Sequence, residues 1–242
     1  MPDPWDIPPF PEIGDDLINK TWAAVGLALS QWELLELALA TLRKFFLASI
    51  GDKIVFNYDD DVPLGFLARA DEIERAAHSF FRRNPSQDNE AEFEALIYEA
   101  RKLALRRNDI AHGVVVGSTK AGDAKGFYLT PALHVPKRYR GGRAAYQYTS
   151  HEMLSFAESF NSLTKRVWRF ADKIQAIVRA SLDIPPGLNY GLGRVLRWCY
   201  AGQLGEKPRS CVNHLRSNLH SLWVRPVTRV THNDLAQGLS KG

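Results

Sequence analysis

Four long stretches of this chain have apolar residues every three or four positions, and this spacing places those residues on one face of an α-helix. The predicted helices span about residues 15–49, 64–83, 88–112 and 150–181. Asp15 or Asp16 can cap the first helix, and Gly113 stands where a left-handed glycine would end the third. The pattern predicts a mainly α protein, an up-down bundle of about four long helices, because short loops make neighbouring helices antiparallel.

The segment between the third and fourth predicted helices is rich in β-branched and aromatic residues. Val114-Val115-Val116 and Gly126-Phe127-Tyr128-Leu129 are separated by a turn that contains glycine and lysine, which predicts a β-hairpin. Tyr146-Gln147-Tyr148 is a candidate for a third short strand. The sequence therefore predicts a small β insert at about residues 113–149, inside a helical domain that spans residues 17–180.

The segments that flank this domain differ from it in composition. Residues 1–16 are rich in proline, which predicts an extended arm. Residues 181–242 carry eight lysines and arginines against three acidic residues, which predicts a basic appendage that is partly disordered. This charge fits contact with phosphate, and it equally fits a solvated tail. The appendage lacks the close cysteine pair of a zinc site, so no metal site is predicted at Cys199, Cys211, His214 and His220.

Three further features bear on the compartment. No uninterrupted apolar run reaches the length of a membrane span, because charged residues break the most apolar segment, at Glu33, Glu36, Arg43 and Lys44. The N-terminal residues lack the basic and apolar regions of a secretory signal. Two cysteines in 242 residues favour a reducing compartment over a disulfide framework. We therefore expect a cytoplasmic protein with no membrane partner.

Polar residues are concentrated at the end of the third predicted helix, which reads Arg106-Arg107-Asn108-Asp109-Ile110-Ala111-His112. Asn108 precedes His112 by four positions and shares its face, whereas Arg107 lies about 140° round an ideal helix, so that Arg107 and His112 flank a cleft. RNA cleavage needs a group that takes the 2′-hydroxyl proton and a cation that stabilises the charge on the phosphate. Histidine suits the first task and arginine the second, while asparagine can orient either group. Ordinary capping of a helix end is the alternative explanation for the same residues.

Arg107, Asn108 and His112, with four residues between the arginine and the histidine, resemble the signature of the HEPN superfamily of helical domains. The order of long helices around a hairpin is also similar, over about residues 17–180. The resemblance implies a HEPN-like fold and a metal-independent endoribonuclease, of the kind found in toxin or antiviral-defence systems. In it Arg107 stabilises the phosphate charge, His112 is the acid and base, and Asn108 orients.

The resemblance also implies partners. These are RNA, a second copy that makes a homodimer with the motif at the interface, and an antitoxin or another defence-system protein; no cofactor is implied. Some members of the superfamily only bind or scaffold, which leaves a non-catalytic module for RNA or nucleotide as an alternative. A structural interaction bundle, in which Arg107 and His112 only cap a helix, is a further alternative.

Other residues are candidates for contact with RNA. The insert carries four cations beside two glycines, with two rings close by in sequence, and such loops grip phosphate and stack on bases; the residues are Lys137, Arg138, Arg140, Arg143, Tyr146 and Tyr148. A solvated turn is the alternative for this loop. Arg106 is a further candidate for RNA contact. Glu33 or Glu36 either pairs with Arg107 or Arg106, or lies solvated at the edge of the first helix.

Overall fold

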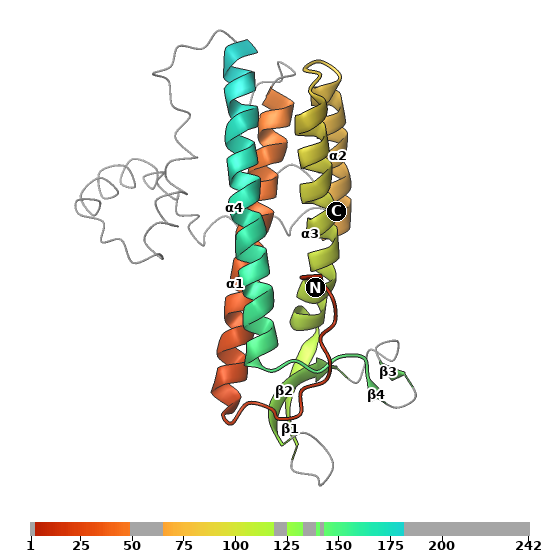
Figure 1. The fold of residues 1–242 in the computed structure, drawn as a ribbon, viewed down its shortest axis with the longest axis vertical. Helices are drawn as coiled ribbons and strands as arrows, with labels where there is room; N and C mark the ends of the chain where they lie inside the picture. Colours follow the sequence, from red (N-terminus) through yellow and green to blue (C-terminus); the bar gives the residue numbers. More distant parts are fainter. Residues whose placement is uncertain (1–2, 49–64, 119–124, 133–138, 141–142, 182–242) are drawn as a thin grey trace, which may run out of the picture. The chain divides into compact units, whose positions relative to one another are not determined.

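The computed structural model is mainly helical, and its described residues include two small two-stranded antiparallel sheets (Figure 1). It describes residues 3–48, 65–118, 125–132, 139–140 and 143–181. The chain divides into two compact units, Met1–Ile184 and Pro185–Gly242, and every described residue belongs to the first. Its elements are α1 (Ile18–Ala48), α2 (Phe66–Phe81), α3 (Gln87–Ala111), β1 (Gly113–Ser118), β2 (Gly126–Pro131), β3 (Tyr139–Arg140), β4 (Arg143–Ala144) and α4 (Ser150–Ser181).

Of the four helices in the described part of the chain, three run in the same direction. Trp32 meets Phe66 and Phe46 meets Phe80, so positions along α1 and α2 advance together. Helix α3 runs the opposite way, as its ion pairs with α4 show, Glu92 with Lys173 and Glu99 with Arg166. In Figure 1 the colours of α1 and α4 both progress upward from the end that holds the strands.

The predicted up-down order is therefore wrong for α1 and α2, which are parallel. Only a short connection forces neighbouring helices to be antiparallel. Residues 49–65 stand between these two helices, and most of them lie outside the described residues. The positions of the four helices along the chain nevertheless agree closely with the predicted ones.

A fully buried tryptophan, Trp32, lies at the centre of the core. Its ring meets Phe66 of α2 and Phe160 of α4 edge-on, at centroid distances of 4.9 and 5.3 Å. Its indole Nε1 donates a hydrogen bond of 2.5 Å to Glu36, which also pairs with Arg69. Trp32 thus joins three helices, and its one polar atom is satisfied.

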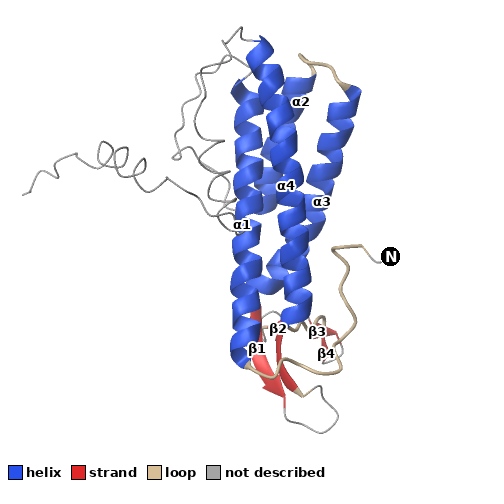
Figure 2. Cartoon of the chain, turned by 60° about the vertical axis from the view of Figure 1, so that its left-hand side comes forward, coloured by secondary structure: helices blue, strands red, loops and turns tan. Residues whose placement is uncertain are grey.

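The strands lie at the end of the bundle where α1 and α4 begin and α3 ends (Figure 2). β1 and β2 form the predicted hairpin, in register from Gly113 opposite Pro131 to Ser118 opposite Gly126. The N-terminal arm and the segment before α4 both pair with β2, through bridges of Asp15 with Phe127 and of Tyr148 with Leu129. The sheet therefore ties together three segments that are distant in sequence.

The aspartate that precedes α1 contacts the start of α4. The Asp15 carboxylate accepts hydrogen bonds from the Ser150 backbone N–H, at 2.8 Å, and from its hydroxyl, at 2.6 Å. It also accepts one from the buried Thr21 hydroxyl, at 2.7 Å. Asp15 thus binds the free backbone N–H group of Ser150, in a helix that begins far along the chain, whereas Asp16 makes an exposed pair with Lys20. The prediction that Asp15 caps the first helix needs this correction.

Replacing Asp15 by alanine is expected to lower the free energy of unfolding by about 1–3 kcal/mol, because it removes three hydrogen bonds to a carboxylate and leaves a buried hydroxyl unpaired. Urea denaturation followed by circular dichroism measures the loss. Asp16→Ala is the matched control and is expected to leave the unfolding midpoint unchanged, since its ion pair is exposed. Equal effects of the two substitutions would contradict this role for Asp15.

By length and composition alone, α1 is a helix that could cross a membrane, with an 18-residue window of mean hydropathy 1.3 that holds at most two charged residues. The expectation from the sequence considered only apolar runs without any charged residue, and it therefore did not identify this window. Core helices of soluble proteins satisfy the same criterion, so this is weak evidence. One face of α1 is buried against the bundle, and that face includes Ala28, Trp32, Leu35 and Leu39.

Candidate functional site

The last turn of α3 presents its polar side chains in two opposite directions. Arg106 and Asp109 are both only 7% exposed and face the interior. Arg107 and Asn108 are half-buried, and His112, the C-cap residue of the helix, is exposed. The string of polar residues thus divides into an inward pair and an outward group. Only the outward group can meet a ligand.

The glycine after the motif has a different role from the predicted one. Gly113 begins β1, and the glycine with a positive φ among the described residues is Gly126. A Cβ atom at Gly113 would lie 2.6 Å from the Leu129 side chain. The helix therefore passes directly into the strand, and glycine fits there because the Leu129 side chain occupies the place of a Cβ atom.

The inward pair belongs to a buried network with two tyrosines. Arg106 Nη1 lies 3.1 Å from Asp109 Oδ2 and donates a hydrogen bond of 3.0 Å to the Tyr148 hydroxyl. That hydroxyl donates to Asp109 Oδ2 at 3.1 Å. The Tyr146 hydroxyl donates to the Asp109 backbone carbonyl at 2.8 Å. Burial raises the pKa of the Tyr148 phenol, the nearby Asp109 raises that pKa further, and the hydroxyl therefore keeps its proton.

This network changes the interpretation of three residues predicted to contact RNA. Arg106 is buried and bound by Asp109 and Tyr148, so its guanidinium does not face solvent. Tyr146 and Tyr148 are also buried, and their rings stack on each other with centroids 4.8 Å apart. Neither ring has a free face for a base. All three residues are part of the buried interior in this structure and do not form a surface for RNA.

The outward group holds a cation that is only weakly neutralised. Arg107 Nη2 lies 3.9 Å from Glu33 Oε1, whose side chain is 68% exposed, and an ion pair of this length in solvent is weak. Arg107 Nη1 donates to Asn108 Oδ1 at 3.3 Å. Of the two glutamates considered, Glu33 is therefore the partner of Arg107, whereas Glu36 pairs with Arg69. Arg107 retains donors that can grip a phosphate.

Arg107 and His112 do not meet within one chain. No hydrogen bond or ion pair joins them among the described residues, and the His112 imidazole has no partner in that part of the chain. This agrees with their separation of about 140° round the helix. A site that uses both groups on one phosphate needs either movement of these side chains or a second copy of the motif.

The other residues predicted to bind RNA are described only in part. Lys137 and Arg138 lie outside the described residues. Arg140 and Arg143 are paired across the short ladder of β3 and β4, of which the backbone is described. The cysteines and histidines considered for zinc also lie outside the described part, and within that part no group of three or more His, Cys, Asp or Glu residues is placed to hold a metal.

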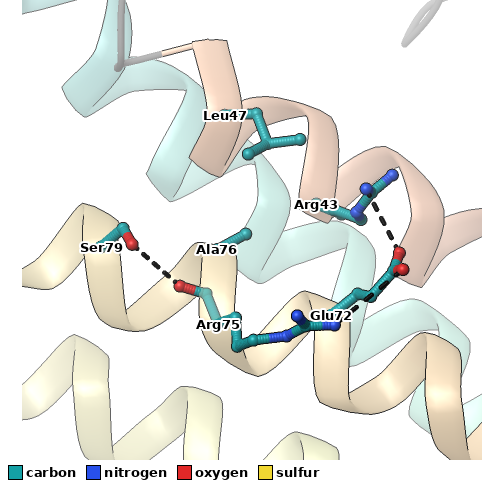
Figure 3. Close-up of a pocket in the computed structure, with 6 residues that line it drawn as sticks. All are labelled: Arg43, Leu47, Glu72, Arg75, Ala76 and Ser79. Atoms are coloured by element: carbon teal, nitrogen blue, oxygen red, sulfur yellow. Dashed lines mark hydrogen bonds and ion pairs between the residues drawn. The ribbon is translucent and has the colours of Figure 1, made fainter.

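An open hollow that the sequence did not indicate lies between α1 and α2, with a volume of about 270 Å³ (Figure 3). Arg43 and Arg75 both point to the Glu72 carboxylate there, with nitrogen–oxygen distances of 3.2 and 4.0 Å. One carboxylate therefore offsets half of the charge of two guanidinium groups. The hollow contains none of the motif residues.

Comparison of the chain with protein-family models, with curated proteins and with solved structures finds no match. The interpretation of the site therefore depends on the geometry of the last turn of α3 and on the resemblance of its sequence motif.

Proposed function

We propose that this protein is a metal-independent endoribonuclease of the HEPN type. The observation that carries the proposal is the division of the last turn of α3, which buries Arg106 and Asp109 and leaves Arg107, Asn108 and His112 facing outward. Simple helix capping would not require, in one turn, both an arginine with so weak a partner and an exposed histidine. The outward group supplies the cation and the proton-transfer group that RNA cleavage needs.

In the proposed reaction the ribose 2′-oxygen attacks the adjacent phosphorus. The 2′-hydroxyl proton passes to the imidazole of one His112, and the bond between phosphorus and the 5′-oxygen breaks. A protonated His112 gives a proton to the departing 5′-oxygen, so that the products are a 2′,3′-cyclic phosphate and a 5′-hydroxyl. Arg107 stabilises the charge on the non-bridging phosphate oxygens, and Asn108 orients the phosphate or the imidazole. No step in this scheme calls for a metal ion.

A second copy of the chain completes the proposed site. Trp22 on α1 is a large apolar side chain that is 53% exposed, so a second surface could cover it. Trp22, Gly26 and Glu33 share one face of α1, because their spacings of four and seven residues correspond to whole helical turns. Glu33 pairs with Arg107, so the face of α1 that holds Trp22 extends to the motif. A homodimer across this face brings two copies of the motif towards each other.

The test is incubation of the purified protein with end-labelled RNA in EDTA, with analysis of the new ends. We expect fragments with 2′,3′-cyclic phosphate and 5′-hydroxyl ends. Arg107→Ala is expected to slow cleavage by about 10²–10³-fold, the usual cost of one donor to a developing negative charge. Arg101→Ala is the matched control on the same helix, because its guanidinium pairs with Asp71 and Glu74 away from the motif.

Two other results would replace the proposal. RNA that is bound but left intact would favour the non-catalytic binding module. A protein that neither binds nor cleaves RNA, and in which Arg107→Ala only lowers stability, would favour the structural bundle. Sedimentation of the wild type and of Trp22→Ala tests the homodimer, which the substitution is expected to weaken.

A further inference from the structure

We infer that Tyr146 and Tyr148 form a clasp that fixes the last turn of α3 and thereby sets the positions of Arg107, Asn108 and His112. The clasp consists of these two tyrosines with the two groups they bind, Arg106 and Asp109. None of the four faces an RNA ligand in this structure, so they act as positioning residues. The catalytic consequence depends on the proposed ribonuclease function, whereas the clasp itself can be measured without it.

The end of a helix needs such a partner. The last four carbonyl groups of an α-helix have no N–H group within the helix to bind. The Tyr146 hydroxyl donates to one of them, the Asp109 carbonyl, at 2.8 Å. Because the helix passes directly into β1 through Gly113, no glycine cap in the left-handed conformation closes this end. The Tyr146 hydroxyl instead satisfies one of the carbonyl groups that such a cap would satisfy.

The second tyrosine acts on the side chains of the same turn. The Tyr148 hydroxyl accepts from Arg106 and donates to Asp109, both of which are almost fully buried. Buried charges are stable only when paired and hydrogen-bonded, so this hydroxyl holds the guanidinium and the carboxylate in one arrangement. Arg106 and Asp109 therefore cannot turn away from the interior without a large loss of interactions.

The clasp is itself anchored in the sheet and the core. The backbone of Tyr148 exchanges two hydrogen bonds with Leu129 of β2, at 2.8 and 2.9 Å. Its ring stacks on Tyr146 and meets Phe156 of α4 edge-on, at 5.3 Å. The β insert thus holds the tyrosines, and the tyrosines hold the helix end. This gives the insert a role in the site other than direct contact with RNA.

The order of residues in the sequence couples the clasp to the motif. Arg106 and Asp109 directly flank Arg107 and Asn108 in one helical turn, so a rotation that displaces the inner pair displaces the outer pair as well. Reacting groups must be held to within a fraction of an ångström, since a shift of about 1 Å costs up to about 10²-fold in rate. The clasp therefore fixes both the fold of the turn and its alignment with a substrate.

Hydrogen exchange of the full-length protein tests the clasp directly. Tyr148→Phe removes the hydroxyl but keeps the ring, and we expect about tenfold faster exchange of the backbone amides of residues 107–113, as for the loss of a buried hydrogen bond. Tyr146→Phe is a second variant with the same expectation. Tyr128→Phe is the matched control, because Tyr128 is a buried tyrosine of β2 without a hydrogen bond to α3 among the described residues. Exchange no faster than in this control would overturn the inference.

The pH dependence of cleavage then tests positioning. A loss of stability alone lowers the rate by one factor at every pH, whereas a displaced His112 changes the shape of the pH–rate profile. We expect Tyr148→Phe to reduce kcat by about ten- to hundredfold and to change that shape, with KM altered less. Faster exchange with an unchanged profile would limit the clasp to a structural role and overturn the positioning inference. A wild type that does not cleave would overturn the proposed function, and the exchange experiment alone would then decide on the clasp.

Discussion

Replacing His112 by alanine is expected to reduce RNA cleavage by about 10²–10⁴-fold, the usual contribution of a general acid or base. His112 is exposed and has no side-chain partner among the described residues, so its removal costs the fold little. RNA affinity is expected to persist, because the cation of the site, Arg107, is retained. Single-turnover cleavage and filter binding, measured on the same preparations, separate the two effects.

His78→Ala is the matched control for this substitution. His78 is also an exposed histidine, and it lies near the end of α2, far along the bundle from the motif (Figure 1). We expect its removal to leave both cleavage and binding unchanged. Cleavage at the wild-type rate by His112→Ala would rule out the catalytic role that we propose for this residue.

The largest effect on stability is expected at Trp32, where replacement by alanine should lower the free energy of unfolding by about 3–5 kcal/mol. The ring is fully buried between Phe66 and Phe160, so its loss leaves a cavity where three helices meet. The substitution also removes the indole donor to Glu36. Urea denaturation at low protein concentration measures the change.

Trp22→Ala provides the comparison on the same helix. Trp22 is 53% exposed, and its replacement is expected to change the stability of the single chain by less than about 1 kcal/mol while it weakens the homodimer that we propose. If the two tryptophans proved equally costly to replace in the single chain, the assignment of buried and exposed faces to α1 would be incorrect.

The sequence predicted the helices well and their directions less well. Long apolar periodicity marks where each helix lies, and turn residues such as Asn84 and Pro85 mark an end. The sequence does not show in which direction α2 runs relative to α1, because residues 49–65 separate the two helices. The predicted direction of α2 is therefore wrong. Asp15 shows the same limit, because a capping residue is evident in sequence but the helix that it caps depends on tertiary contacts.

At the site, the sequence identified the group of polar residues but did not show which of them are buried and which face outward. A signal for the division was present, since Leu103, Arg106 and Ile110 are spaced by three and four positions and so share the buried face. Because Arg106 is charged, it was interpreted as an exposed residue that contacts RNA, whereas it is buried. The alternation of Tyr146 and Tyr148 indicated a strand with both rings on one side, but which side is covered depends on packing against α4.

The hydrogen bonds from Ser150 to Asp15 join positions 135 residues apart in the sequence. During synthesis on the ribosome, Asp15 emerges long before its partner exists, so α4 acquires its starting contact only after most of the first unit has been made. Contacts between such distant positions slow folding. A shortened chain that began at Ile18 would leave α4 without that contact, and the arm before α1 is therefore part of the smallest unit that folds as described.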